Sequence, residues 1–309
     1  MSERIFYIDL FESFNSNYFW RDAFQTLGVV ETFDCRQPKD NLERRILAFE
    51  PTHIHLGGSV KPGRSVDPAM VRRICQQTGA TASCFRGDPG WSDYHLELAG
   101  GVTLLFISNM THVRQFAERG QANCRYLPCP TEPSVFQYMP GERQYDVVYA
   151  GWNTPRANLT GLLDAVHECF GLTVAGPRWG DTKYACIGNA FNEEYAKLCG
   201  ETKIMLSPVG DHWRNLERYF SNRVANTLCS RCFLIAAYTP GMEEVFEKGK
   251  HLEWYTDEDN LLTLIAYYLE HADERERIAK SGRRRVLRDM TFEKSAARII
   301  EDCRAVCGG

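Results

Sequence analysis

The stretch of sequence that decides the fold is residues 219–290, YFSNRVANTLCSRCFLIAAYTPGMEEVFEKGKHLEWYTDEDNLLTLIAYYLEHADERERIAKSGRRRVLRDM. Its polar beginning, SNR (221–223), leads into a helical pattern, and the apolar run FLIAA (233–237) is typical of a buried strand. A YTPG turn (238–241) follows, and Glu243 and Glu244 are expected to begin a helix after it. A second short strand and two long helical patterns complete the stretch. Short apolar strands that alternate with amphipathic helices predict a parallel α/β layer.

The same alternation continues through the rest of the chain. Strands are predicted in two series, at 4–9, 29–34, 52–56, 79–85, 102–108 and 124–128, and then at 145–151, 172–176 and 203–207. Four prolines and Gly141 separate the series, which is typical of a linker. We therefore expect one domain over 1–140, a second over 141–290, and a final helix within 291–309.

Composition allows this organisation and limits the function. The 309 residues are 44% hydrophobic and 25% charged, which is enough for two domains with separate cores. The formal net charge of -4 gives no overall basic character of the kind that attracts nucleic acid or anionic membranes. Residues 1–140 nevertheless hold 12 Arg and 2 Lys against 15 acids, and arginine forks suit phosphate and carboxylate groups.

Targeting and cysteine patterns predict a cytoplasmic protein. The beginning, MSERIFYIDL, lacks a basic region and a cleavage site, and no apolar run approaches the length of a membrane span. The 12 cysteines are expected to be mostly free thiols, because a chain of this size does not need a disulfide framework. The pairs Cys229/Cys232 and Cys303/Cys307 are interpreted as structural thiols, and no metal site is predicted.

Three segments carry a resemblance to a known family. They are YLPCPTEPSVF (126–136), YDVVYAGWNTPR (145–156) and FSNRVANTLCSRCFLIAAYTPGMEEVF (220–246). Their order and spacing resemble glycosyltransferases of the GT-B architecture, and within that group the CgeB or spore-maturation type. The resemblance is best from about Leu127 to the end of the chain. The first half is similar only at its first strand, at Gly57-Gly58 and at Asp88-Pro89.

The resemblance implies the fold and the activity. We expect an α/β protein with two Rossmann-like domains that face a central cleft, and a C-terminal helix that packs back on the N-terminal domain. The implied enzyme is a hexosyl- or pentosyltransferase that moves a sugar from a nucleotide-sugar, with UDP expected, to an acceptor hydroxyl, without a metal or bound cofactor. The acceptor is a small molecule, polysaccharide or protein.

Two alternatives stay open. A phage-type DNA glycosyltransferase that acts on hydroxymethylated pyrimidine bases is compatible with the arginine-rich first half and would require base flipping. A module that binds nucleotide-sugars without turnover is compatible with two departures from the family. Asn226 stands where many relatives carry a Glu for the donor ribose, and Arg231-Cys232 replaces a Gly-Gly pair.

Donor-binding residues are expected where strands end and helices begin. Helix N-termini and arginines suit a diphosphate, and ligands of open α/β sheets bind beyond the carboxyl ends of strands. A glycine there lets the backbone approach a ligand closely. The donor candidates are Gly151, Arg156, Ser221, Asn222, Arg223, Asn226, Tyr238, Thr239, Gly241 and Glu243.

The first domain is expected to supply the acceptor site. Asp88, in Gly-Asp-Pro-Gly after a strand, is the candidate catalytic base, although an Asp before Pro also organises turns. His55, Tyr18 and Trp20 are acceptor-side candidates, with positions in the hydrophobic core as the alternative. The acidic triplet 257–259 is interpreted as a helix cap and the run RRR (283–285) as a solvated helix face.

Overall fold

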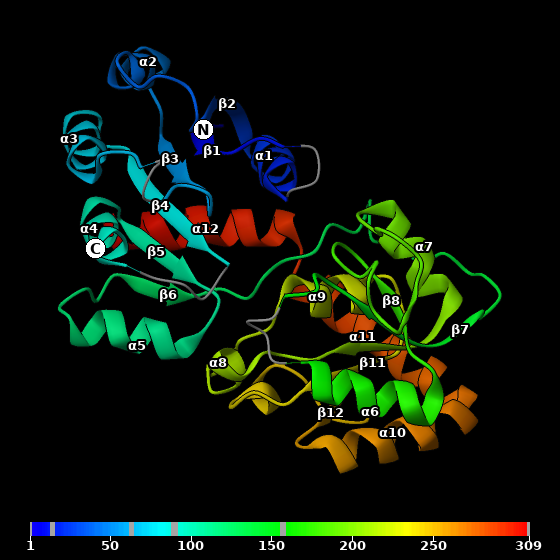
Figure 1. Cartoon of the computed structure of the whole chain (residues 1–309). Coiled ribbons are helices and arrows are strands. Elements are labelled where there is room, and N and C mark those ends of the chain that lie inside the picture. Colours follow the sequence, from blue (N-terminus) through cyan, green and yellow to red (C-terminus); the bar gives the residue numbers. More distant parts are fainter. Residues whose placement is uncertain (1, 13–15, 62–64, 88–91, 155–158, 308–309) are drawn as a thin grey trace. The chain divides into compact units, whose positions relative to one another are not determined.

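The chain folds into two compact units. In a computed structural model, which describes residues 2–12, 16–61, 65–87, 92–154 and 159–307, unit 1 comprises Met1–Pro128 with Phe292–Gly309 and unit 2 comprises Cys129–Thr291. Each unit is a parallel six-stranded sheet with helices on both faces (Figure 1). The predicted α/β class is confirmed, because every strand pairing in both sheets is parallel.

Unit 1 has the strand order β2-β1-β3-β4-β5-β6. The strands are β1 (Glu3–Asp9), β2 (Gly28–Asp34), β3 (His53–Leu56), β4 (Thr81–Arg86), β5 (Leu104–Ile107) and β6 (Cys124–Tyr126). The helices are α1 (Asn17–Gln25), α2 (Leu42–Phe49), α3 (Pro68–Thr78), α4 (Asp93–Gly101), α5 (Met110–Glu118) and, from the end of the chain, α12 (Phe292–Cys307). The chain leaves β1 on one side to form β2 and returns on the other side to form β3.

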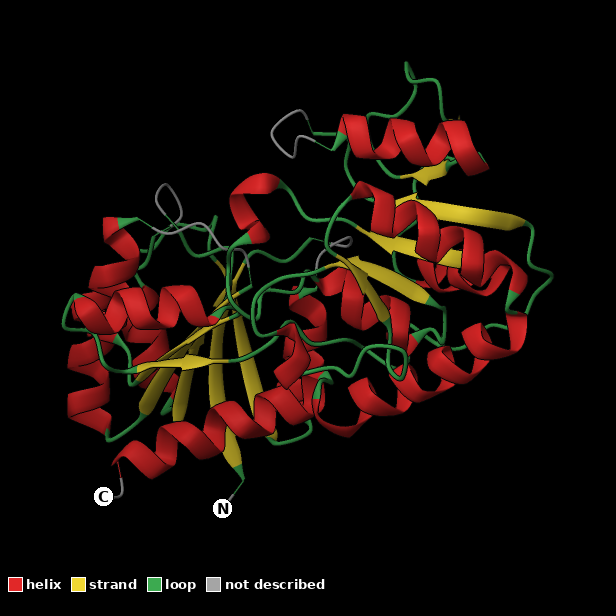
Figure 2. Cartoon of the chain, turned by 90° about the horizontal axis from the view of Figure 1, so that it is seen from below, coloured by secondary structure: helices red, strands yellow, loops and turns green. Residues whose placement is uncertain are grey.

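Handedness decides which helices cover which face of this sheet. Right-handed crossovers place α1 on one face and α2 to α5 on the other, where their apolar side chains share one core with β1, β3, β4 and β5. That leaves the α1 face of β4 and β5 without a crossover helix. Helix α12 packs there, against β4 and β5 and beside α1 (Figure 2). The expected packing of the final helix on the N-terminal domain is confirmed.

A buried polar layer lies on this same face of the sheet. His53 Nδ1 and Nε2 lie 2.7 Å from Thr81 Oγ1 and from Ser83 Oγ, and His55 Nδ1 lies 2.8 Å from Ser83 Oγ. Both histidines are fully buried. Burial lowers the pKa of His53 to about 3 and lowers the pKa of His55 well below its ordinary value, so both rings stay neutral near neutral pH.

Unit 2 is a second parallel sheet with a different strand order, β12-β11-β10-β7-β8-β9, in which two strands instead of one lie on the short side of its first strand. The strands are β7 (Tyr145–Ala150), β8 (Thr173–Ala175), β9 (Ala185–Cys186), β10 (Thr202–Ser207), β11 (Leu234–Ala237) and β12 (Glu253–Tyr255). The helices are α6 (Thr160–Phe170), α7 (Glu193–Glu201), α8 (Asp211–Arg214), α9 (Asn222–Cys229), α10 (Glu258–Glu270) and α11 (Ala272–Asp289). Side chains of α6 and α10 share a core with β7, β10 and β11, whereas α7 and α11 both pack on α9.

Two local predictions for unit 2 were wrong. The helix expected to begin at Glu243 and Glu244 is a single 3-10 turn, Met242–Glu244, after which the chain continues without a helix to β12. The arginines at 283–285 are not all solvated. Arg283 donates to the carbonyl of Cys229 at the end of α9, and Arg285 donates to Val245 O at 2.8 Å. These guanidinium groups therefore tie α11 to the elements that carry the site described below.

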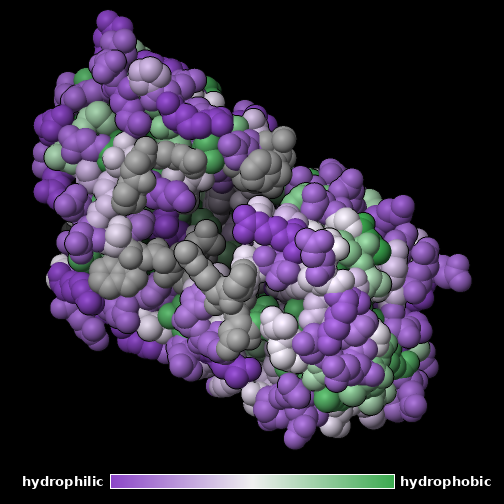
Figure 3. Space-filling view, viewed as in Figure 1, coloured by the Kyte–Doolittle hydropathy of each residue, from purple (hydrophilic) through white to green (hydrophobic). Residues whose placement is uncertain are grey.

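The surface is mainly polar. Hydrophilic residues cover most of the face drawn in Figure 3, with apolar residues in separate patches. Among the described residues, no helix is both long and apolar enough to cross a membrane.

The buried histidine layer predicts that acid weakens the fold. Unfolded histidines bind a proton near pH 6.5, whereas folded His53 does so only near pH 3, so its contribution is intact above pH 6.5 and declines as the pH falls. At about pH 5 the neutral His53 lowers the free energy of unfolding by about 2 kcal/mol relative to its value at neutral pH. The urea midpoint should fall between neutral pH and about pH 5, and by less in His53→Gln. His212→Gln, which changes an exposed histidine, is the control. If the urea midpoint depends on pH equally in wild type and in His53→Gln, the account is contradicted.

Candidate functional site

The carboxyl end of β7 is a closely packed, polar part of unit 2. Strand β7 lies between β8 and β10, so the chain changes direction across the sheet here, and ligands of open α/β sheets bind at such a switch. Arg223, from the first turn of α9, reaches this end and donates from Nε to Ala150 O at 2.5 Å. Its guanidinium carbon lies 4.8 Å from the centre of the Tyr149 ring. The position therefore holds a fixed positive charge.

Gly151 makes room for that charge. A Cβ atom on Gly151 would lie 2.6 Å from Arg223 Nη2 and 2.7 Å from Tyr149 Oη. Any larger residue would displace one of the two side chains. The structure thus brings together Gly151 and Arg223, two residues that are 72 positions apart in sequence.

The first turns of α9 present further candidates. Ser221 is the residue before the helix, and its side chain makes no capping hydrogen bond. Asn222 is exposed, and Asn226 lies one turn later on the same side of the helix. The Oδ1 atom of Asn226 is buried and has no hydrogen-bond partner among the described residues. The start of α9 therefore presents a helix N-terminus, a hydroxyl and the Asn226 amide oxygen near Arg223.

The loop after β11 is tied to the segment that precedes α9. Thr239 Oγ1 donates to Tyr219 O at 3.2 Å, and Arg218 N donates to Pro240 O at 2.7 Å. Arg218 also pairs with Glu244. Gly241 has a φ of 77°, and the loop turns there. These contacts hold the candidates at 238–243 and those at 221–226 in one fixed arrangement.

Two side chains of this loop interact with each other. Tyr238 donates its hydroxyl to Glu243 at 3.2 Å, and Glu243 is exposed. Burial raises the pKa of Tyr238, and the hydrogen bond that it donates to the Glu243 carboxylate raises the pKa further. Glu243 is therefore an oriented, ionisable acceptor at the edge of the loop.

Arg231, which replaces a glycine of the family that the sequence resembles, has a backbone conformation that glycine would adopt. Its φ is 56°, a left-handed conformation that glycine adopts readily and other residues seldom adopt. The side chain pairs with Glu276 at 3.2 Å and lies 4.3 Å from the Tyr138 ring. Arg231 thus closes the end of α9 through contacts with α11 and the linker segment, away from Arg223.

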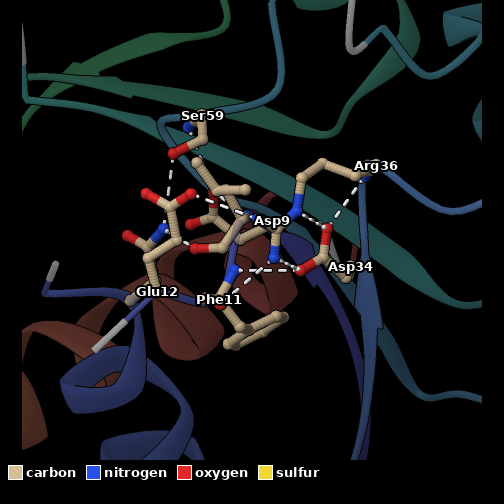
Figure 4. Close-up of polar contacts among 8 residues, drawn as sticks. Asp9, Phe11, Glu12, Asp34, Arg36 and Ser59 are labelled. Atoms are coloured by element: carbon tan, nitrogen blue, oxygen red, sulfur yellow. Dashed lines mark hydrogen bonds and ion pairs between the residues drawn. The ribbon is translucent and has the colours of Figure 1, made fainter. Parts of the chain in front are cut away.

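A second polar cluster lies at the carboxyl ends of β1, β2 and β3 in unit 1, which is the switch point of that sheet (Figure 4). Asp9 is fully buried and accepts hydrogen bonds from Tyr7 Oη at 2.7 Å and from the N–H groups of Leu10 and Ser59 at 2.8 and 3.1 Å. Burial raises its pKa, and the hydrogen bonds counter that effect.

The exposed part of this cluster is built around Arg36. It donates to both carboxylate oxygens of Asp34, at 3.0 and 2.6 Å, and to Glu12 at 3.1 Å. The hydrogen bond from Arg36 holds the pKa of Asp34 below its ordinary value. The edge of unit 1 therefore presents ionised oxygens and a guanidinium, which can hydrogen-bond a polar ligand.

The acceptor-side candidates occupy different environments. His55 and Trp20 are buried, and their ring centres lie 5.7 Å apart. Trp20 also contacts Phe85 and Phe292, so its position is that of a core residue. Tyr18 is half-buried, with the Arg21 guanidinium 4.8 Å from its ring centre. The candidate base Asp88 and the donor candidate Arg156 lie outside the described residues.

Features that resemble metal sites have structural explanations. Asp257 Oδ1 accepts from Asn260 N–H at 2.9 Å, which confirms that the acidic triplet caps α10. Cys229 and Cys232 are buried free thiols. Within the part of the chain that the structure describes, no group of three or more His, Cys, Asp or Glu side chains is placed to hold a metal ion.

Sequence reasoning missed three residues at these edges: Tyr149, Asp9 and Arg36. Tyr149 and Asp9 lie at the carboxyl ends of predicted strands, so the rule that selected Gly151 could have selected them too. Arg36 follows the predicted strand 29–34 by two residues. What the sequence does not reveal is that Tyr149 and Arg223 meet, because their contact depends on the packing of α9 beside β7.

Comparison with known proteins agrees with this architecture. Residues 156–301 match the protein family described as glycosyl transferase-like. No protein of curated function matches the sequence.

Several solved structures share the fold over nearly their whole length. HepE of Anabaena, solved with UDP and glucose, has a TM-score of 0.69 at 13% identity, with 98% of this chain and 100% of that chain covered. A glycosyltransferase from Rickettsia africae has a TM-score of 0.73 at 11% identity, covering 99% and 98%. Sucrose-phosphate synthase from Thermosynechococcus elongatus has 0.71 at 12%, covering 99% of each chain. The fold is therefore GT-B; the CgeB type stays a prediction.

The packing at the unit 1 edge predicts that Gly57, which follows β3, tolerates no side chain. A Cβ atom there would lie 1.7 Å from Asp9 Oδ2 and 2.1 Å from Asp9 Cγ. Gly57→Ala should lower the free energy of unfolding by about 1–3 kcal/mol. Gly58→Ala is the matched control, because its Cβ would meet only Phe85 O at 3.6 Å. Equal melting temperatures for the two variants would show that Asp9 does not hold the position inferred here.

Proposed function

We propose that the chain is a nucleotide-sugar-dependent glycosyltransferase whose unit 2 binds a UDP-sugar. The observation that carries the proposal is the guanidinium of Arg223, held by Ala150 O and the Tyr149 ring over a glycine at the switch point of the sheet. A fixed cation beside the N-terminus of α9 suits a diphosphate, because helix N–H groups and an arginine both favour negative charge.

Different neighbouring groups would bind different parts of the donor. The N–H groups at the start of α9 and Arg223 would hold the diphosphate. The buried Oδ1 of Asn226, unpartnered among the described residues, would accept a hydrogen bond from a ribose hydroxyl, without the charge that a glutamate would add. Tyr238 and Glu243, in the loop after β11, would contact the sugar hydroxyls. The structures of HepE with UDP and with UDP-glucose, on the same fold, support this class of donor.

The chemistry follows from the position of Arg223. As the acceptor oxygen attacks the anomeric carbon, the bond to the diphosphate breaks and negative charge grows on the leaving group. A preorganised guanidinium stabilises that charge, and this stabilisation lowers the barrier. We propose that the reaction needs no metal, because Arg223 and the helix N–H groups supply the positive field, and no cofactor besides the donor.

The acceptor is assigned to unit 1. The carboxylates of Asp34 and Glu12, arranged around Arg36, can hydrogen-bond the hydroxyl groups of an acceptor. Asp88 remains the candidate base that takes the proton from the attacking hydroxyl. Assay of the products distinguishes a hexosyltransferase from a pentosyltransferase, and retention from inversion of the sugar's configuration.

Arg223→Ala should weaken UDP binding by about tenfold to a hundredfold, since a hydrogen bond to a charged group contributes about 1.5–3 kcal/mol. Isothermal titration calorimetry with UDP and with UDP-glucose, in EDTA, measures the effect. Arg284→Ala removes an exposed arginine of the same unit and should bind like wild type. Wild-type affinity in Arg223→Ala would exclude Arg223 from the diphosphate site.

Turnover distinguishes an enzyme from a binding module. UDP release is measured with wild type, in EDTA, against a panel of sugars, polysaccharides, proteins and hydroxymethylated DNA. Release that depends on one acceptor class supports the transferase and identifies that class. Tight donor binding with no release for any acceptor would leave a nucleotide-sugar-binding module instead.

A further inference from the structure

A cavity of about 390 Å³ lies in unit 2 on the other side of β7 from α9. Its described walls are the end of β7, residues 152–154, the first turns of α6 and the loop that follows β8. A volume of this order is typical of small-molecule sites. None of the donor candidates that the structure describes lines it.

Four aromatic side chains line the cavity: Tyr149, Trp152, Trp179 and Tyr184. Trp179 donates from Nε1 to Gly151 O at 2.7 Å, which fixes its ring. Trp152 is 52% exposed, a large apolar side chain left at the surface. The two loops that carry the tryptophans are joined, since Asn153 N–H donates to Pro177 O at 3.1 Å. The aromatic walls are therefore held in place without a ligand.

The polar part of the lining is charge-balanced. Lys183 Nζ lies 3.0 Å from Asp164 Oδ1 and 3.3 Å from Glu168 Oε1. Tyr184 donates its hydroxyl to Asp164 at 2.7 Å, and this bond, together with Lys183, lowers the pKa of Asp164. An ionised carboxylate has about four acceptor positions, so Asp164 can accept further hydrogen bonds from a ligand. Within this lining Lys183 is paired with carboxylates, and a second cation, the Arg178 guanidinium, lies 5.7 Å from the centre of the Trp152 ring.

The angles between the aromatic rings narrow the class of ligand that fits the cavity. Tyr149 and Trp179 meet at 88°, and Trp179 and Tyr184 meet at 68°. These walls do not form the parallel slot that would enclose a flat nucleobase. A single aromatic face with hydrogen-bond acceptors beside it suits a ring that has an apolar C–H face and hydroxyl edges.

We propose that this cavity is a carbohydrate-binding site for a neutral sugar ring, separate from the nucleotide site and beyond the donor chemistry proposed above. Trp152 stacks against the C–H face of the sugar, and Asp164 accepts from its hydroxyls. The Tyr149 ring contacts both Arg223 and the cavity, so the two sites share one wall. A bound saccharide, such as an acceptor or product chain, is thereby kept beside the donor.

The test is sugar binding by saturation-transfer NMR without nucleotide, with glucose, galactose, N-acetylglucosamine and maltose at millimolar concentrations. At least one sugar should bind to wild type. Trp152→Ala should weaken it by about threefold to tenfold, the range expected for loss of an aromatic contact. Asp164→Asn, which preserves shape, should weaken it too. Tyr267→Ala, which removes an exposed aromatic residue of α10, should have no effect.

UDP titrations of the same variants separate this proposal from the proposed function. Both cavity variants should bind UDP like wild type, and saturating UDP should leave the sugar bound. Failure of UDP to bind wild type would contradict the donor site but not the cavity. The carbohydrate site itself is overturned if no sugar binds, if neither variant weakens the sugar, or if UDP displaces it.

Discussion

The arrangement of unit 2 depends on one packing constraint, the absence of a side chain at Gly151. Only a glycine leaves space for the Arg223 guanidinium between Ala150 O and the Tyr149 ring, since a Cβ atom would lie 2.6 Å from Nη2. Arg223 in turn fixes the start of α9 against β7. The loop after β11 is tied to the residues before α9 through Tyr219. Three segments distant in sequence thus form one polar edge.

Unit 1 is also a parallel α/β sheet, but its strand order differs from that of unit 2. Right-handed crossovers leave part of one sheet face uncovered, and α12, from the far end of the chain, covers it. Beneath that face lie His53 and His55; both ring nitrogens of His53 and the Nδ1 atom of His55 are hydrogen-bonded to hydroxyls of β4. Because these buried histidines stay neutral, the free energy of unfolding falls in acid.

Periodicity was sufficient for the fold, because β-strands buried on both faces read as short apolar runs and their helices as amphipathic stretches. Periodicity did not predict the local structure that depends on tertiary contacts. Glu243 and Glu244 lie in a single 3-10 turn instead of a helix, and Arg283 and Arg285 donate hydrogen bonds to carbonyls that no sequence pattern reveals. For the site, strand ends and glycines selected Gly151 and Arg223, but the role of Tyr149 follows only from the packing of α9 beside β7. The predicted roles of Asp88 and Arg156 stay predictions.

The central claim is that a nucleoside diphosphate binds to unit 2 at the switch point between β7 and β10. A crystal structure of the chain with UDP tests this most directly. The account predicts the diphosphate within hydrogen-bond distance of the Arg223 guanidinium and of the N–H groups at the start of α9, with a ribose hydroxyl on Asn226 Oδ1. A diphosphate bound elsewhere, or a uridine inside the aromatic cavity beside Tyr149, would contradict it.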